Sequence, residues 1–440
     1  MGFRLPLLAI FVLLNLIAYL ALRRTVAAWV PAAGRRRKIL GGVAVAVFLL
    51  NLPLLVFFIR PLGGGLDQIP TSLLRVGFYP AMAWLATLLA FLILAGPPML
   101  AWGGIKALVV LYRRKKKPAL SPLSAAPSVA PMVSRRNFLA GGAGMLIPGL
   151  YGAALYGVYG NLDEIEISDE VSIPVANLPA SLEGLTVVQL SDIHVGPYIR
   201  EKELQHAVSL VNGLHPDLVA ITGDLIDRDL ASLPVAVRGL AGIRSTLGVF
   251  TVLGNHDIYS DPYSFTSNHR GGVKIVQGLE SIGIRTLRNE VEWLGSGQDR
   301  LALLGLDWLT SNSSSGNFYR YREAETRQQL RQMAAQAGEE TPKLLLAHHP
   351  DTFSDAIPYK IDLTLSGHTH GGGQVVLGYV NGVPIGVATF RFKYLSGLYQ
   401  ENGCSLYVNR GLGYLGIPIR INCPPEISRF RLVRAGARVS

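Results

Sequence analysis

Five short polar motifs in the last two-thirds of the chain carry residue types that bind divalent metal ions. Each motif follows a run of residues that predicts a β-strand, and each offers an aspartate, asparagine or histidine side chain. Carboxylate oxygens and imidazole nitrogens suit such cations, and two neighbouring ions need one carboxylate that bridges them. The pattern therefore predicts a site for two divalent ions. The motifs are Asp192-Ile193-His194, Gly223-Asp224, Gly254-Asn255-His256-Asp257, His348 and Gly367-His368-Thr369-His370.

The spacing within the motifs suggests how the side chains divide between two ions. Asp192 and His194 are two residues apart after a predicted strand, so both can face one ion. Asp224 follows a glycine, which permits a tight turn and makes this carboxylate the natural bridge. His368 and His370 flank a single residue, so each can serve a different ion.

The third motif adds a weak ligand and a candidate acid. Asn255 offers a neutral amide oxygen, and the adjacent His256 is not needed as a ligand. Two metal ions roughly 3.5–4 Å apart can bind a phosphate oxygen, activate a bridging water and stabilise the charge of in-line attack. The leaving oxygen still needs a proton, which His256 can supply if Asp257 bonds its other ring nitrogen. The predicted chemistry is hydrolysis of a phosphomonoester or phosphodiester by a hydroxide that bridges the ions.

Taken singly, the motifs have ordinary structural explanations. A Gly-Asp pair is usually a turn, and a single Asp-x-His is more often a surface pair. All five in one order, each after a predicted strand, make that explanation improbable.

At these motifs the chain resembles the calcineurin-like metallophosphoesterase superfamily. The resemblance covers about Glu183 to Ile427 and is closest to a membrane-associated or exported bacterial branch, in which 393–399 and 409–413 also look familiar. It implies an α/β fold, a four-layer αββα sandwich of two mixed sheets. The ligands it implies are Asp192, His194, Asp224 and His370 for the first ion and Asp224, Asn255, His348 and His368 for the second, with His256 as the acid.

Two features depart from the family pattern. His348 is followed by a second histidine, His349, which is expected to lie behind the ligands or at the surface. Three glycines, 371–373, stand where two are common, so the geometry of that loop is open. Asp227 is expected to support the site from behind the ligands.

The charge distribution separates the chain into two parts. Residues 1–160 hold 17 of the 41 Lys and Arg residues but only one acidic residue, Asp67, which gives a net charge of +16. Residues 161–440 hold the other 24 against 29 acidic residues, which gives −5. Because the basic part is also the apolar part, the charge indicates membrane topology and shows no nucleic-acid surface.

Four apolar stretches in the basic part predict transmembrane helices, since a helix needs roughly 20 apolar residues to cross a bilayer. The third lies within an apolar run at 76–112, which two short crossings would also explain. The fourth is rich in Gly and Ala, which suits close helix packing. A flexible linker is predicted at 113–134, and the four predicted helices are 5–22, 39–59, 78–102 and 138–159.

Lys and Arg concentrate in the first and third connections between these helices. The positive-inside rule then puts both connections in the cytoplasm and the C-terminal domain in the periplasm or outside the cell. Residues 134–139, Ser-Arg-Arg-Asn-Phe-Leu, resemble a twin-arginine export signal. A pair of positive-inside arginines explains them as well, and both readings give the same orientation.

The chain is therefore expected to consist of a membrane region, 1–160, and a metallophosphoesterase domain, 161–440. Strands and helices alternate from residue 185 to 365, which favours an α/β sandwich with its site at the strand ends. The many short β-rich runs at 374–432 suggest a second sheet. Loops 259–270 and 307–321 are expected to select the substrate.

Three functions fit these features. The leading one is a membrane-anchored phosphoesterase that uses two divalent ions, such as Mn, Fe or Zn. A hydrolase of lipid-linked or cell-envelope phosphates is the alternative, because an anchor raises the effective concentration of a lipid substrate. A metal-binding sensor without turnover belongs to another class. Cys404 and Cys423 can form a disulfide if exported, although two separate residues are the favoured reading.

Overall fold

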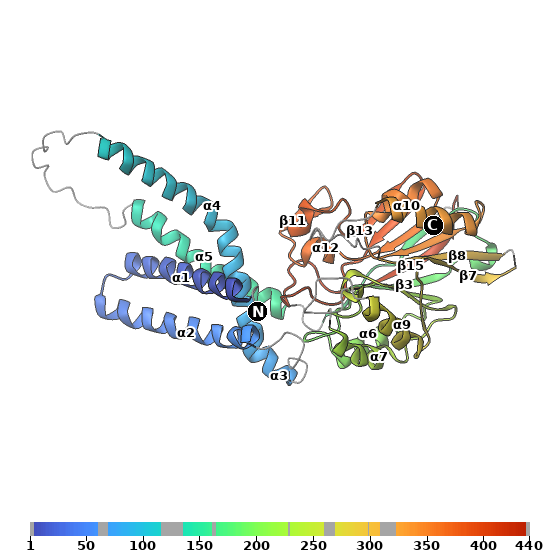
Figure 1. Ribbon diagram of the computed structural model, residues 1–440, viewed down its shortest axis with the longest axis horizontal. Helices are drawn as coiled ribbons and strands as arrows, with labels where there is room; N and C mark the ends of the chain where they lie inside the picture. The colour runs from blue at the N-terminus through green and yellow to red at the C-terminus, as the bar shows by residue number, and fades with distance from the viewer. Residues whose placement is uncertain are drawn as a thin grey trace, which may run out of the picture. The chain divides into compact units, whose positions relative to one another are not determined.

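The computed structural model describes residues 4–59, 69–115, 135–160, 164–227, 229–258, 269–297, 299–308 and 323–436. Most of the predicted linker at 113–134 lies outside these ranges, as do Ser134 and most of the two loops expected to select the substrate. The chain divides into two compact units, one of residues 1–64 and 69–160 and the other of residues 65–68 and 161–440. Figure 1 shows the elements of both units.

The first unit is built from apolar helices. A short turn of helix, α3 (Thr71–Leu73), continues through a π-helical turn, η1 (Leu74–Phe78), into the third long helix. That helix runs unbroken through its two prolines, which supports one crossing in this region and not two. The long helices are α1 (Arg4–Trp29), α2 (Ala33–Ile59), α4 (Tyr79–Lys115) and α5 (Arg135–Tyr159).

Three stretches of the described residues are helical, long and apolar enough to cross a membrane: Leu8–Trp29, Ala33–Leu55 and Thr71–Pro98. The fourth predicted segment is helical as α5 but is not among these three. It packs closely on α1, since a Cβ atom at Gly144 would lie 2.0 Å from the Thr25 hydroxyl oxygen. Small residues permit such an approach between helices, as its Gly-rich sequence predicted.

The second unit contains two mixed sheets. The first has the strand order β1-β15-β3-β4-β5-β6, with β2 also paired to β15. Its strands β3 to β6 are parallel, while β15 runs antiparallel to β3. Its bounds are β1 (Glu166–Ile167), β2 (Val171–Val175), β3 (Thr186–Leu190), β4 (Leu218–Thr222), β5 (Gly248–Val252), β6 (Ile284–Thr286) and β15 (Glu426–Arg434).

The second sheet has the order β13-β14-β10-β9-β8-β7. Strands β8, β9, β10 and β14 are parallel, and β7 and β13 are antiparallel edges. A separate hairpin joins β11 (Gly378–Val380) to β12 (Val383–Ile385). The bounds of the sheet are β7 (Glu290–Ser296), β8 (Asp299–Leu306), β9 (Lys343–Ala347), β10 (Leu363–Ser366), β13 (Gly397–Glu401) and β14 (Cys404–Val408).

Helices cover the outer faces of the two sheets (Figure 1). One core cluster packs the first sheet against α6, α7 and α9, and another packs the second sheet against α10. A third cluster joins residues of both sheets, among them Val187 and Leu344. The predicted αββα sandwich is therefore confirmed. The helices are α6 (Glu201–Gly213), α7 (Leu233–Leu240), α8 (Asn255–Ile258), α9 (His269–Glu280), α10 (Glu323–Ala337), α11 (Thr352–Ala356) and α12 (His370–Gly373).

The prediction that residues 374–432 form a second sheet is wrong in part. The second sheet already begins at β7, and only β13 and β14 of the C-terminal strands extend it. Strand β15 instead lies beside β3 in the first sheet, where its residues Phe430 and Leu432 join the core between the sheets. Cys404 and Cys423 are both buried and free.

Candidate metal centre

The polar motifs follow strands of both sheets and meet at one place. The loop after β3 carries Asp192 and His194, and the loop after β4 carries Asp224. Helix α8 begins directly after β5, and the remaining motifs follow β9 and β10. Because parallel strands end at the same edge of a sheet, these loops converge. The candidate ligands that are buried are Asp192, His194, Asp224, Asn255, His348 and His370, while His368 is half-buried.

One cluster consists of Asp192, His194 and His370, whose candidate ligand atoms all lie within 4.8 Å of one another. The Nε2 atoms of His194 and His370 are 3.0 Å apart, and His370 Nε2 is 3.4 Å from Asp192 Oδ1. Two metal–nitrogen bonds of about 2.1 Å that meet near a right angle would place their nitrogens about 3 Å apart. The cluster therefore fits one ion.

A second cluster consists of Asp224, His348 and His368. Asp224 Oδ2 lies 3.1 Å from His348 Nε2 and 3.7 Å from His194 Nε2, so this carboxylate reaches both clusters. Asn255 Oδ1 is buried and has no hydrogen-bond partner among the residues that the structure describes. A buried acceptor without a partner is costly unless something else satisfies it, and a cation would do so. The residues of the two clusters fit a pair of divalent ions.

Hydrogen bonds fix the orientation of these side chains. His348 Nδ1 donates to the Thr222 carbonyl oxygen at 2.6 Å, which leaves the lone pair of Nε2 directed at the cluster. The backbone N–H of His368 donates to both Asp192 oxygens, at 3.0 and 3.1 Å. Asp224 Oδ1 accepts from the backbone N–H of His256 at 2.8 Å. Each of these bonds leaves the candidate ligand atom available.

The backbone of the site is strained. Residues other than glycine rarely adopt positive φ, and such outliers gather at functional sites. Two glycines are required by close approach, since a Cβ atom at Gly223 would lie 2.7 Å from His348 Nδ1 and one at Gly367 would lie 2.1 Å from Asp192 Oδ2. Five candidate ligands have positive φ, namely Asp192 (46°), His194 (47°), Asp224 (52°), His368 (71°) and His370 (48°).

His256 lies beside the clusters, but its carboxylate partner is not the predicted one. Its Nδ1 is 3.1 Å from Asp227 Oδ1. Asp257 instead accepts from backbone N–H groups, those of Leu225 at 2.9 Å and Gly254 at 2.9 Å. The expected bond between Asp257 and His256 is therefore wrong, because Asp257 turns toward the strand-end loops that it holds together. Asp227, which was expected to support the site from behind the ligands, is the carboxylate that contacts His256.

Burial and neighbouring charges shift the pKa values of these groups. Burial raises the pKa of Asp192 to about 6 and lowers the pKa of His194 to about 3. Burial also acts to lower the pKa of His348, but the carboxylates of Asp224 and Asp192 outweigh it and raise that pKa to about 9. Nearby cations would favour ionised carboxylates and neutral imidazoles, the forms that bind metal.

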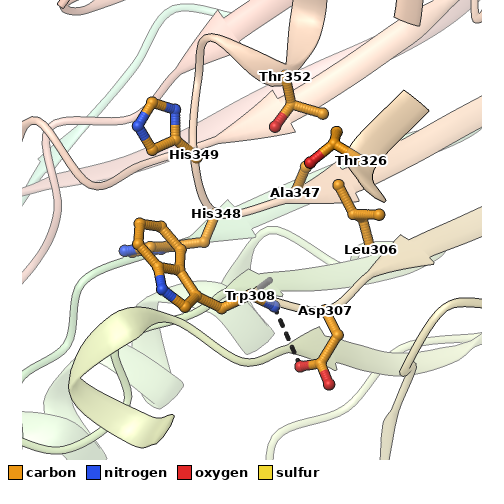
Figure 2. Close-up of a pocket in the computed structure, with 8 residues that line it drawn as sticks. All are labelled: Leu306, Asp307, Trp308, Thr326, Ala347, His348, His349 and Thr352. Atoms are coloured by element: carbon orange, nitrogen blue, oxygen red, sulfur yellow. Dashed lines mark hydrogen bonds between the residues drawn. The ribbon is translucent and has the colours of Figure 1, made fainter. Parts of the chain in front are cut away.

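A pocket of about 330 Å³, including the space at its mouth, opens beside His348 (Figure 2). Trp308 and His349 line it together with residues of β8, β9, α10 and α11. The ring centroid of Trp308 is 5.6 Å from that of His348 and 5.1 Å from that of His368. His349 lies behind the ligands, as expected, with its ring 5.1 Å from that of His368. Sequence reasoning included Trp308 in the loop 307–321 that was expected to select the substrate but did not single it out, although its place just after β8 matches that of the other site residues.

Two mixed sheets of an αββα fold direct buried carboxylates and imidazoles to one place, where they form a candidate metal site. A model of the calcineurin-like phosphoesterase family matches residues 185–372. The "Uncharacterized metallophosphoesterase YkuE" of Bacillus subtilis is 30% identical over 313 residues, which cover 68% of this chain and 98% of that protein. The chain belongs to the calcineurin-like metallophosphoesterase family.

Two animal relatives carry the name "Transmembrane protein with metallophosphoesterase domain". The Danio rerio protein is 35% identical over 289 residues, which cover 64% of this chain and 60% of the relative. The Bos taurus protein is 32% identical over 275 residues, which cover 60% of this chain and 56% of the relative. The chain thus matches a little over half the length of these two relatives.

Proposed function

We propose that the chain is a membrane-anchored, metal-dependent phosphoesterase that hydrolyses a phosphomonoester or phosphodiester. The observation that carries this proposal is the pair of ligand clusters with Asp224 Oδ2 within 3.7 Å of a histidine of each. A single shared carboxylate is what a two-ion site requires. Membership of a phosphoesterase family supports the choice of reaction.

The proposed ligands follow the two clusters. The mixture of carboxylate, amide and imidazole donors suits Mn, Fe, Zn or a similar ion. When bound, such ions polarise the phosphoryl group and supply a nucleophile from water at neutral pH. Asp192, His194, Asp224 and His370 would hold one ion, and Asp224, Asn255, His348 and His368 the other.

His256 is the proposed general acid. Its bond to Asp227 Oδ1, 3.1 Å long, orients the ring. A proton held at the other ring nitrogen can then pass to the leaving oxygen. Asp257 has a positioning role in this proposal, because its carboxylate holds the backbone N–H groups of Leu225 and Gly254.

The remaining proposals concern location and substrate. We propose residues 1–160 as the membrane region and 161–440 as the catalytic domain, and the bias of Lys and Arg supports a location of that domain outside the cytoplasm. Export through the twin-arginine route is compatible with residues 134–139. A lipid-linked or cell-envelope phosphate is the alternative substrate class, supported by the anchor.

Turnover by the full chain tests this function. Purified in detergent and supplied with Mn²⁺, it is expected to hydrolyse an aryl phosphomonoester or diester. Asp224→Ala removes the shared carboxylate, so turnover should fall by more than the about 10²–10⁴-fold that a general acid contributes. His206→Ala, an exposed change on α6, is the matched control. A folded chain without turnover in the presence of Mn²⁺, Fe²⁺ or Zn²⁺ would contradict the proposal and favour a sensor.

A further inference from the structure

An exposed apolar surface lies on the β11–β12 hairpin and the short helix that follows it, η5 (Val387–Phe390). Phe390 is 92% exposed, Leu377 79% and Val387 77%. Large apolar side chains are seldom this exposed together unless they meet a partner or a membrane. We call this group the hairpin surface. It holds six of the ten exposed large apolar residues described in the second unit, namely Leu377, Tyr379, Val380, Val383, Val387 and Phe390.

The hairpin surface has a defined shape. Asn381 and Gly382 connect the strands and both have positive φ, 51° and 79°, as in a type I′ turn. The Tyr379 hydroxyl donates to the Asn422 carbonyl oxygen at 3.3 Å, and the Thr389 hydroxyl donates to the Pro384 carbonyl oxygen at 2.9 Å. The exposure of its apolar side chains therefore belongs to a folded element.

The hairpin surface also adjoins the candidate metal centre. Helix α12, which begins at the candidate ligand His370, packs against β12 and η5. A Cβ atom at Gly386 would lie 2.1 Å from the Gly372 carbonyl oxygen, so the two backbones are in close contact. Figure 1 places β11 and α12 together, at the end of the second unit opposite β7.

The chain itself points to a lipid bilayer as the occupant. Its described residues include three helical stretches that are long and apolar enough to cross a membrane. Only six residues, 160–165, separate the end of α5 from β1, and such a tether spans at most about 25 Å. The apolar side chains are followed by Arg391 and Lys393, both exposed. Apolar and aromatic groups beside cationic ones are typical of elements that lie in the membrane interface.

We propose that the hairpin surface inserts into the interface of the bilayer that the chain's own helices cross. Burial of the apolar side chains favours such an insertion, and the short tether keeps the bilayer within reach. The hairpin surface then holds the candidate metal centre against the lipid surface. This proposal does not depend on the reaction, because it concerns where the second unit docks.

Lipid-dependent quenching of a probe tests the docking. The full chain with Phe390→Cys is labelled with an environment-sensitive thiol fluorophore and reconstituted at one copy per nanodisc of phosphatidylcholine and phosphatidylglycerol. Gln277→Cys, on the exposed face of α9, is the matched control. The unsubstituted chain measures the background from Cys404 and Cys423, both buried. Phosphatidylcholine that carries a nitroxide near the headgroup is the quencher.

The probe at position 390 should emit at shorter wavelength than the control and lose most of its emission when the nitroxide lipid is present. Equal quenching at positions 390 and 277 would overturn the proposal. A blue shift at position 390 without lipid quenching would also overturn it, because another part of the chain would then cover the surface. A second copy cannot account for either result, since each disc holds one chain.

Discussion

The candidate metal centre and the hairpin surface both depart from the usual distribution of side chains between interior and surface, the first by burying polar groups and the second by exposing apolar ones. Six polar candidate ligands are buried at the first, and six large apolar side chains are exposed at the second. Soluble domains normally bury apolar groups and leave polar ones in water. Both regions follow strands of the same unit and meet at α12. Burying polar groups and exposing apolar ones both cost free energy in the isolated chain. Each region therefore indicates a partner outside the chain, cations for the metal centre and lipid for the hairpin surface.

The strain of the backbone separates the two regions further. At the metal centre, positive φ falls on residues with full side chains such as Asp224, at a cost of order 1–3 kcal/mol each. In the hairpin, positive φ falls on Asn381 and Gly382, which adopt it readily. Of these two regions, the metal centre is therefore the one whose backbone is strained. Substitutions in the two regions should accordingly differ in what they damage.

The largest effect among the following predictions is expected for His256→Ala. Its backbone N–H still donates to Asp224, so the change removes the imidazole and leaves that contact in place. Turnover of a phosphoester with a poor, alkyl leaving group should fall by about 10²–10⁴-fold. An aryl ester whose phenolate leaves without a proton should be affected far less. Rates on the two esters, with bound metal quantified, measure the difference.

Equal losses of turnover on both esters would show that His256 serves the site in another way. Asp227→Asn, which keeps the size of the side chain but removes its charge, should reproduce part of the same leaving-group dependence. That result would assign the support of His256 to the observed partner, 3.1 Å away.

A smaller effect is expected for Gly367→Ala. The added methyl carbon would lie 2.0 Å from Ser191 Oγ and 2.1 Å from Asp192 Oδ2, so the carboxylate must move. The change also disturbs the hydrogen bond from Ser191 Oγ to Asp192 Oδ2, and losing a bond that orients a ligand typically costs about 10–100-fold in metal affinity. Titration of metal into the purified chain measures this loss. Gly213→Ala, whose new methyl group would meet nothing within 4 Å, should bind metal like the unsubstituted chain.

Unchanged metal affinity in Gly367→Ala would mean that the site tolerates displacement of Asp192. Metal binding would then not require the strained and closely packed backbone of the centre, and this difference between the centre and the hairpin would have no functional cause.

The sequence predicted the ligand types and their place after strands because both follow from local chemistry. His348 and His370, which follow different strands, both come close to Asp192, with their Nε2 atoms 4.0 and 3.4 Å from its Oδ1 atom. The partner of His256 could not be predicted, because adjacency favoured Asp257 while the path of the loop after β4 brings Asp227 to the ring. Side-chain direction after a tight turn depends on φ, which residue types do not specify.

The sheet to which each C-terminal strand belongs could not be predicted from the sequence either. Strand β15 pairs with β3, more than 230 residues earlier, and such long-range pairing leaves no local pattern. The hairpin did have a local signal, since Asn381-Gly382 between short β-rich runs is a strong hairpin pattern. The exposure of the hairpin had no such local signal, because Leu and Val are residue types that usually lie in a core. Only the three-dimensional packing shows that Leu377 and Val387 face outward.

The smallest effect on the metal centre is expected for Phe390→Ser. The side chain is 92% exposed, so the change should alter the free energy of unfolding in detergent by no more than about 0.5 kcal/mol. Turnover of a water-soluble aryl ester should stay the same.

In nanodiscs, however, amide hydrogens of residues 377–390 should exchange faster than in the unsubstituted chain, because less apolar surface holds the hairpin in the interface. Val273→Ser, an exposed apolar change on α9, should leave this exchange unaltered. If Phe390→Ser instead lowered turnover as far as His256→Ala does, the hairpin would act by supporting α12. It would then belong to the structure that supports the metal centre and would not be a separate region.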